Sequence, residues 1–315
     1  DGMPANRRTH GHGQGYADIN FLIPELIGSM RVRKGPYFAD EGDFSSADAA
    51  HIDYLNRIDK SFAELTVGSF GYRRGLAIGS LPAWSGNILA ALEVTGYNGP
   101  WDVPDSVRKI NGVLRYSEGT RDDGFSVTGM VYRNSWNATD QVAQRAIDDG
   151  IIGRFGSLDP TDGGKAERYS LSTRWAKTHD AGITKVEAYG INSSLRLFNN
   201  FTYFLDDPVN GDQFSQSDRR TLAGVNASHT FDHQLGLLPS ETVIGLQSRY
   251  DDIHVGLTKT VARQYLSTVR QDHVREGSVA LYAQNMLRWT SWLRTVTGVR
   301  YDWFAADVNS DTPEN

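Results

Sequence analysis

The chain has 315 residues, with 32 Lys and Arg against 38 Asp and Glu, a net charge of −6 and no Cys. The mildly acidic balance without a basic block argues against a nucleic-acid partner, and the missing Cys excludes disulfides, a thiolate metal site and a Cys nucleophile. A mean hydropathy of −0.45 argues against a helical membrane protein.

Residues 1–60 form a Gly-rich segment with polar clusters and no regular strand pattern. Within it, the apolar run at residues 18–27 predicts a short helix or turn, and residues 30–34 predict a strand that ends at the turn Gly35-Pro36. We therefore expect residues 1–60 to form one unit and residues 61–315 a second one.

Glycines alternate with polar side chains at residues 9–16 of the first unit. Glycine gives the backbone a freedom that is costly to order and that a purely structural segment rarely keeps. We predict that the hydrogen-bonding side chains of this stretch contact a polar substrate: His10, His12, Gln14 and Tyr16. A metal site at His10 and His12 lacks a third ligand in the sequence, so no metal is predicted there.

An acidic cluster, Asp40, Glu41, Asp43 and Asp48, follows just before the second unit. A cation or a polar substrate is one conceivable partner of these carboxylates. Ion pairs with arginines on the inward face of the second unit are the favoured one. The arginines expected to face inward are Arg168, Arg174, Arg249 and Arg300.

From residue 61 onward the dominant pattern has a period of two, which indicates strands with two different faces. It predicts about eleven strands of about ten residues, the length that crosses a bilayer at the usual tilt. Apolar side chains such as Ile110, Leu114, Leu171 and Trp175 are expected to face lipid. Lys109, Arg115, Arg168 and Arg174 alternate with them and are expected to face inward.

Links between the predicted strands alternate in length. The short ones are 81–87, 118–123, 178–182, 232–240 and 288–292, and the long ones are 98–108, 137–165, 199–218 and 253–272. Transmembrane β-barrels have short periplasmic turns and long outer loops. The first hairpin, near residues 69–71, is an exception because it is short where a long loop is due.

All seven Trp residues lie at or beyond the ends of predicted strands, where indole rings suit a membrane–water interface. Trp84, Trp175, Trp289 and Trp292 are on the short-turn side, and Trp101, Trp136 and Trp303 are on the long-loop side. On the long-loop side, the aromatic residues predicted to contact substrate are Trp101, Trp136, Tyr203 and Phe204. Asp206, Asp207, Asn210 and Asp212 are possible Ca²⁺ ligands but fit no known spacing.

The first unit resembles the plug of TonB-dependent outer-membrane receptors. The residues that carry the resemblance are Asp1-Gly2-Met3-Pro4, Ile23-Pro24-Glu25-Leu26-Ile27, Met30-Arg31-Val32-Arg33-Lys34-Gly35-Pro36 and Gly42. The chain departs from the family pattern where the usual Ala-x-x-Gly before the last plug strand is replaced by Ala39-Asp40-Glu41-Gly42-Asp43-Phe44.

This resemblance implies an all-β fold, a transmembrane antiparallel β-barrel with part of an N-terminal plug domain. Residues 1–60 would be the C-terminal part of the plug, and residues 61–315 the first half of a 22-stranded barrel. It also implies a bacterial outer-membrane receptor that takes up a scarce nutrient: a siderophore, haem, cobalamin, a metal chelate or a glycan. Its partners would be the bilayer, that ligand and the TonB complex of the inner membrane. Because the chain starts and stops abruptly, we expect the TonB box and the second half of the barrel to be missing from it.

Two alternatives come from other classes of protein, a passive porin-like channel and a soluble all-β domain that binds or cleaves glycans. The plug signature argues against the channel, and the loop lengths and Trp positions argue against the soluble domain. No nucleophile-elbow or zinc-protease motif occurs, so we expect neither an enzyme nor a cofactor. The sequence does not specify the substrate.

Overall fold

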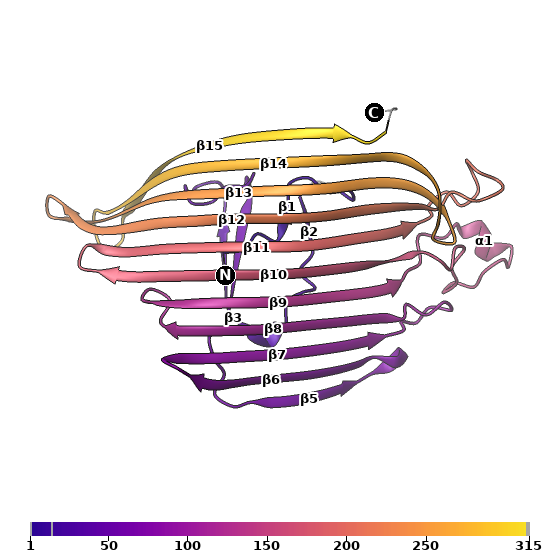
Figure 1. Ribbon diagram of the computed structural model, residues 1–315, viewed down its shortest axis with the longest axis horizontal. Coiled ribbons are helices and arrows are strands. Elements are labelled where there is room, and N and C mark those ends of the chain that lie inside the picture. Colours follow the sequence, from indigo (N-terminus) through magenta and orange to yellow (C-terminus); the bar gives the residue numbers. More distant parts are fainter. Residues whose placement is uncertain (1, 14, 313–315) are drawn as a thin grey trace.

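The computed structural model describes residues 2–13 and 15–312. Eleven antiparallel strands lie side by side in chain order and form one curved sheet (Figure 1). Its strands are β5 Phe62–Val67, β6 Arg73–Ala83, β7 Gly86–Tyr97, β8 Val107–Gly119, β9 Gly124–Asn137, β10 Gly163–His179, β11 Gly182–Asn199, β12 Phe214–Leu235, β13 Leu238–Val261, β14 Gln264–Arg288 and β15 Arg294–Ser310. The predicted all-β fold is confirmed.

The two faces of the sheet differ because successive side chains of a strand point to opposite sides. One face exposes Ile110, Leu114, Leu171 and Trp175, and the exposed fraction of Leu114 is 60%. Arg115 and Arg168 lie on the other face and are only 4% and 5% exposed. The arginine face therefore points inward and the apolar face outward, as the alternation predicts.

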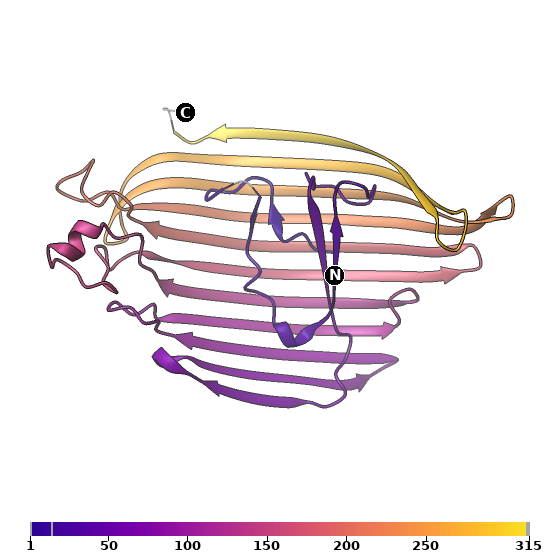
Figure 2. The ribbon, with the colours of Figure 1, turned by 180° about the vertical axis from the view of Figure 1, so that it is seen from behind.

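The N-terminal residues lie against the inward face of the sheet, and β3 and β4 run across the sheet strands (Figure 2). The elements here are β1 Asn6–Arg7, β2 Tyr16–Ala17, the 3₁₀ helix η1 Pro24–Leu26, β3 Ile27–Lys34 and β4 Asp48–Tyr54. Strand β3 pairs with β4 and contains the strand predicted at residues 30–34. Pro24 begins η1, where its missing N–H costs nothing.

The main apolar core lies between these N-terminal residues and strands β6–β11. Ile23 and Leu26 pack there with Leu89 of β7, and all three are completely buried. Full burial of one such side chain stabilises the fold by about 1.5–3 kcal/mol. The other members are Phe21, Tyr54, Leu76, Ile78, Ala91, Val113, Met130, Tyr132, Ala166 and Leu195.

The connections between the sheet strands have the predicted lengths, including the short first hairpin between β5 and β6, except at one place. Loops 98–106, 138–162 (which holds α1, Gln144–Asp148) and 200–213 lie at one end of the sheet, opposite the short turns (Figure 1). The long loop predicted at residues 253–272 is wrong, because β13 and β14 continue to a two-residue turn at Ala262 and Arg263. In this extension the apolar side chains change face: Ile253, Val255 and Leu257 follow Asp251 on the inward side, whereas the apolar side chains of residues 244–250 are exposed outward.

The position of Trp303 also differs from the prediction. It lies inside β15, opposite Val279 of β14, because β15 extends to Ser310. Trp303 points outward into an apolar belt, and the register puts Tyr250 and Tyr301 in the rows of paired residues next to it. Within the described part of the chain, none of the helices has the length and apolar character needed to cross a membrane.

Candidate functional site

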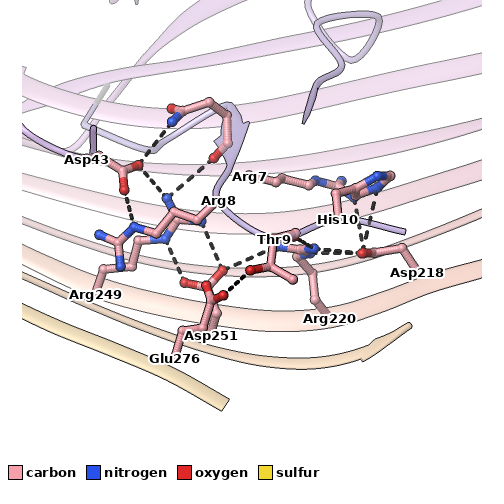
Figure 3. Close-up of polar contacts among 11 residues, drawn as sticks. Arg7, Arg8, Thr9, His10, Asp43, Asp218, Arg220, Arg249, Asp251 and Glu276 are labelled. Carbon is pink, nitrogen blue, oxygen red and sulfur yellow. Dashed lines mark hydrogen bonds and ion pairs between the residues drawn. The ribbon is translucent and has the colours of Figure 1, made fainter. Parts of the chain in front are cut away.

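Four charged side chains of β12 and β13 form a charge cluster on the inward face of the sheet: Asp218, Arg220, Arg249 and Asp251 (Figure 3). Each Arg is two residues from an Asp on its own strand, so both side chains point inward. Arg220 donates to Asp218 at 2.9 and 2.6 Å, and Arg249 donates to Asp251 at 2.7 and 2.9 Å. The two pairs meet where Arg220 Nη1 lies 3.5 Å from Asp251 Oδ1.

This charge cluster is deeply buried, which decides its energetics. Arg220 and Asp251 are 1% and 0% exposed. A buried cluster of charges is stable only while every charge keeps its partners. Removal of one partner typically lowers the stability of the fold by about 3–5 kcal/mol.

The N-terminal residues dock onto the charge cluster through charge-assisted hydrogen bonds (Figure 3). Arg7 Nη1 donates to Asp218 at 3.4 Å, and the backbone carbonyl of Thr9 accepts a bond from Arg220. Asp43 accepts from Arg249 at 2.7 Å and also from Arg8. The interface thus combines the main apolar core with ion pairs such as Arg74 with Glu25 against β6–β11, and it is mainly ionic against β12 and β13.

The predicted ion pairs of the acidic cluster are found in part. Asp43 pairs with Arg249 of the sheet, whereas Asp40 and Glu41 accept bonds from Arg33 of the N-terminal unit itself. Arg300 donates to the Ala39 carbonyl at 3.2 Å rather than to a carboxylate of this cluster. Asp48 is exposed.

His10 is buried where the N-terminal residues pack against β12. Its ring stacks on Tyr16 with centroids 4.2 Å apart and planes 5° from parallel, and its Nε2 lies 3.8 Å from Asp218 Oδ2. Burial lowers the pKa of His10 to about 4, and the charges of Arg7 and Arg220 add to this effect while Asp218 opposes it. His10 is therefore neutral at physiological pH and positions the stretch rather than facing solvent.

His12 is the exposed histidine of the stretch. Its Nδ1 lies 2.9 Å from Gln216 Oε1 of β12, and its backbone N–H donates to His10 Nδ1. Tyr16 is half-buried and contacts His12 edge-on at 5.9 Å between centroids. Of the four predicted residues, His10, His12 and Tyr16 are thus brought together, and Gln14 lies outside the described residues.

The aromatic residues predicted on the long-loop side are not gathered with this stretch. Trp101 lies 6.0 Å from Phe155, between the centroids of their rings, and Trp136 packs against the main apolar core. The hydroxyl of Tyr203 donates to the Gln141 carbonyl at 2.6 Å, whereas Phe204 is exposed. Asp212, one of the possible Ca²⁺ ligands, accepts bonds from the backbone N–H groups of residues 205–207.

The comparisons with known proteins agree with this architecture. The sequence model of the family described as TonB dependent receptor-like, beta-barrel matches residues 97–315, well over half of the chain. The chain belongs to this family. No curated protein sequence matches it.

Solved structures of TonB-dependent receptors share the fold of this family member. The copper transporter OprC has a TM-score of 0.69 and 14% identity, over 95% of this chain and 50% of its own. The ferric citrate transporter FecA, unliganded, has a TM-score of 0.70 and 10% identity, over 90% and 43%. The siderophore receptor PiuA from Acinetobacter baumannii has a TM-score of 0.71 and 13% identity, over 91% and 48%. The chain spans about half the length of these structures.

One polar cluster of this TonB-dependent receptor chain escaped the sequence analysis. Gln213 joins loops 138–162 and 200–213, since its amide donates to Asp159 at 3.1 Å and to Asp162 at 3.3 Å. Asp140 lies in the same cluster and accepts from the backbone N–H of Asn200 at 3.0 Å. Burial and the charges of Asp159 and Asp140 raise the pKa of Asp162 to about 8. We refer to Asp140, Asp159, Asp162 and Gln213 as the loop clasp.

Proposed function

We propose that the chain is part of an energy-coupled receptor of the bacterial outer membrane that imports a scarce nutrient. The candidate nutrients are a siderophore, haem, cobalamin, a metal chelate or a glycan. The observation that carries the proposal is the docking of residues 2–13 and 15–58 on the inward face of a family barrel. A passive channel would need that face open to water.

The chemistry of the docking supports a plug that can be displaced. Along β12 and β13 it depends on hydrogen bonds between charged groups, each worth about 1.5–3 kcal/mol when made. Water entering the interface can replace such bonds one by one, whereas a continuous apolar core separates only at a large cost in exposed area. We infer that this ionic side is where the plug loosens when the TonB complex pulls on it.

The outward face supports a position in the bilayer. Its exposed apolar side chains, such as Leu114 and Leu171, form a belt that water would not stabilise. In this proposal residues 1–60 are the C-terminal part of the plug, residues 61–315 are the first half of the barrel, and further strands complete a barrel of 22.

The ligand, in this proposal, binds at the end of the sheet that carries the long loops. His12 is the proposed contact from the plug, since it bonds Gln216 two residues into β12 after loop 200–213, and Tyr16 lies edge-on to it. Trp101, Trp136, Tyr203 and Phe204 are the proposed contacts from the loop side, together with Gln14. His10 acts as a positioning residue, because its ring is buried under this stretch.

The experiment is an uptake assay in cells that express the intact protein. Radiolabelled iron siderophores, haem, cobalamin, copper chelates and oligosaccharides are offered singly to cells with and without a functional TonB complex. The proposal expects one ligand to accumulate only in cells with TonB. Accumulation that is equal in both strains would show a passive channel instead and overturn the proposal.

A further inference from the structure

A second cluster of polar side chains lies on the outward face, where β13 and β14 run past the apolar belt. Ile253 and Val274 point inward, at 0% and 6% exposure. The side chains next to them along the two strands therefore point outward, and they are Asp252, His254 and His273, all partly exposed. The strand register sets His254 directly opposite His273.

Three metal-ligating atoms converge in this cluster. His273 Nε2 lies 3.0 Å from Asp252 Oδ1, and His254 Nε2 lies 3.8 Å from the same oxygen. One ligand atom from each of the three residues lies within 4.8 Å of the others. Zinc bonds of about 2.0–2.1 Å in a tetrahedral arrangement put neighbouring ligand atoms about 3.3–3.4 Å apart. The two distances to Asp252 Oδ1 lie on either side of that value.

The neighbouring groups hold these ligands in place. Both Nε2 atoms lie toward Asp252 Oδ1, while the two imidazole rings stack with centroids 4.2 Å apart and planes 11° from parallel, so one ring rotates out of the stack when both bind a single ion. Arg275 Nε lies 3.7 Å from Asp252 Oδ2, the second carboxylate oxygen. That contact orients the carboxylate and leaves Oδ1 for a metal, as groups behind a ligand commonly do.

We propose that Asp252, His254 and His273 bind a divalent transition-metal ion, Zn²⁺ or Cu²⁺, on the outward surface of the barrel. Imidazole and carboxylate ligands suit these ions, and three protein ligands leave a fourth position for water or an external ligand. The bound ion ties β13 to β14 above the apolar belt. The site is separate from the docking of residues 2–58, so the proposal does not depend on the import function.

The test is isothermal titration of the intact, detergent-solubilised protein with ZnCl₂, read together with the visible absorption of bound Co²⁺. Mutation of a residue that only orients a metal ligand typically lowers metal affinity roughly 10–100-fold. Removal of a ligand itself is expected to lower it further. His254→Ala and His273→Ala should therefore each remove one equivalent of bound metal and the Co²⁺ bands of this site. The matched control is His229→Ala, whose ring stacks with His179 at a wider spacing of 6.5 Å.

Titrations of His254→Ala and His273→Ala that match the parent would overturn the proposal. So would an equal loss of metal in His229→Ala, because it would show unspecific binding to surface histidines. If the Ala variants do not fold, His254→Gln and Asp252→Asn decide the question, since both substitutions keep a polar side chain of similar size and remove the imidazole or carboxylate ligand. Loss of the equivalent in these variants supports the site, and its retention refutes it.

Discussion

Arg220 is the residue whose replacement most sharply tests the docking of the N-terminal unit. Its guanidinium makes two bonds to Asp218, one to Asp251 and one to the Thr9 carbonyl. Arg220→Gln removes all four, but only the bond to Thr9 crosses to the N-terminal unit. Asp218 keeps Arg7, and Asp251 keeps Arg249.

The magnitude follows from these contacts. Loss of one bond with a charged donor weakens docking by about 1.5–3 kcal/mol. At 1.36 kcal/mol per tenfold, the opening of residues 6–13 should become about 10- to 150-fold more frequent. The loss in global stability should be larger, about 3–5 kcal/mol, since a buried charged network loses one member.

The assay is hydrogen–deuterium exchange of the intact protein in lipid nanodiscs, read on peptides from residues 2–13. Arg219→Gln is the matched control, because Arg219 precedes Arg220 on the same strand but is exposed on the opposite face. We expect fast exchange in Arg220→Gln and parental exchange in Arg219→Gln. Equal exchange in the two variants would refute the assignment of the charge cluster to docking.

The remaining predictions concern the loop clasp, the lipid face and the ligand contacts. The folded-state pKa of Asp162 is raised, so the folded loop 138–162 loses stability as pH rises from about 4 to about 8. Hydrogen–deuterium exchange measured at pH 6 and 8.5 should therefore show less protection of this loop at the higher pH, and Asp162→Asn should abolish the difference. An unchanged difference in the variant would contradict the clasp. Leu171→Arg should cost about 2–4 kcal/mol in urea unfolding from lipid vesicles, whereas Leu237→Arg in an exposed turn should cost little; equal costs would argue against a lipid-facing Leu171. His12→Ala should weaken titrated binding of the imported ligand at unchanged Tm, whereas His10→Ala should lower Tm; the reverse pattern would reassign the two residues.

The sheet could be predicted from the sequence because most strands alternate apolar and polar side chains, as at Ile110–Tyr116 of β8. The same principle was harder to apply at residues 253–261, because the apolar side chains Ile253, Val255 and Leu257 alternate on the inward side there, whereas those of residues 244–250 face outward. In that extension β13 is held by its pairing with β12 and β14, and the residue pattern within one strand does not reveal such pairing.

The candidate site was predictable only where its parts are local. The Gly-rich stretch around His10 and His12 stands out in the sequence, but the burial of His10 depends on Asp218, more than two hundred residues away. The loop clasp was missed for the same reason, since Asp140 and Gln213 come from two different loops. Charges on adjacent strands meet through the register, and the sequence of one strand does not reveal that register.

Ion conductance across a planar lipid bilayer tests the central claim most directly, that residues 2–58 are a plug docked inside an outer-membrane barrel. The intact protein is compared with a variant that lacks residues 2–58, each inserted from detergent at the same concentration. We expect the intact protein to stay closed and the shortened variant to open stable, ion-conducting pores. Equal conductance of the two proteins would contradict it.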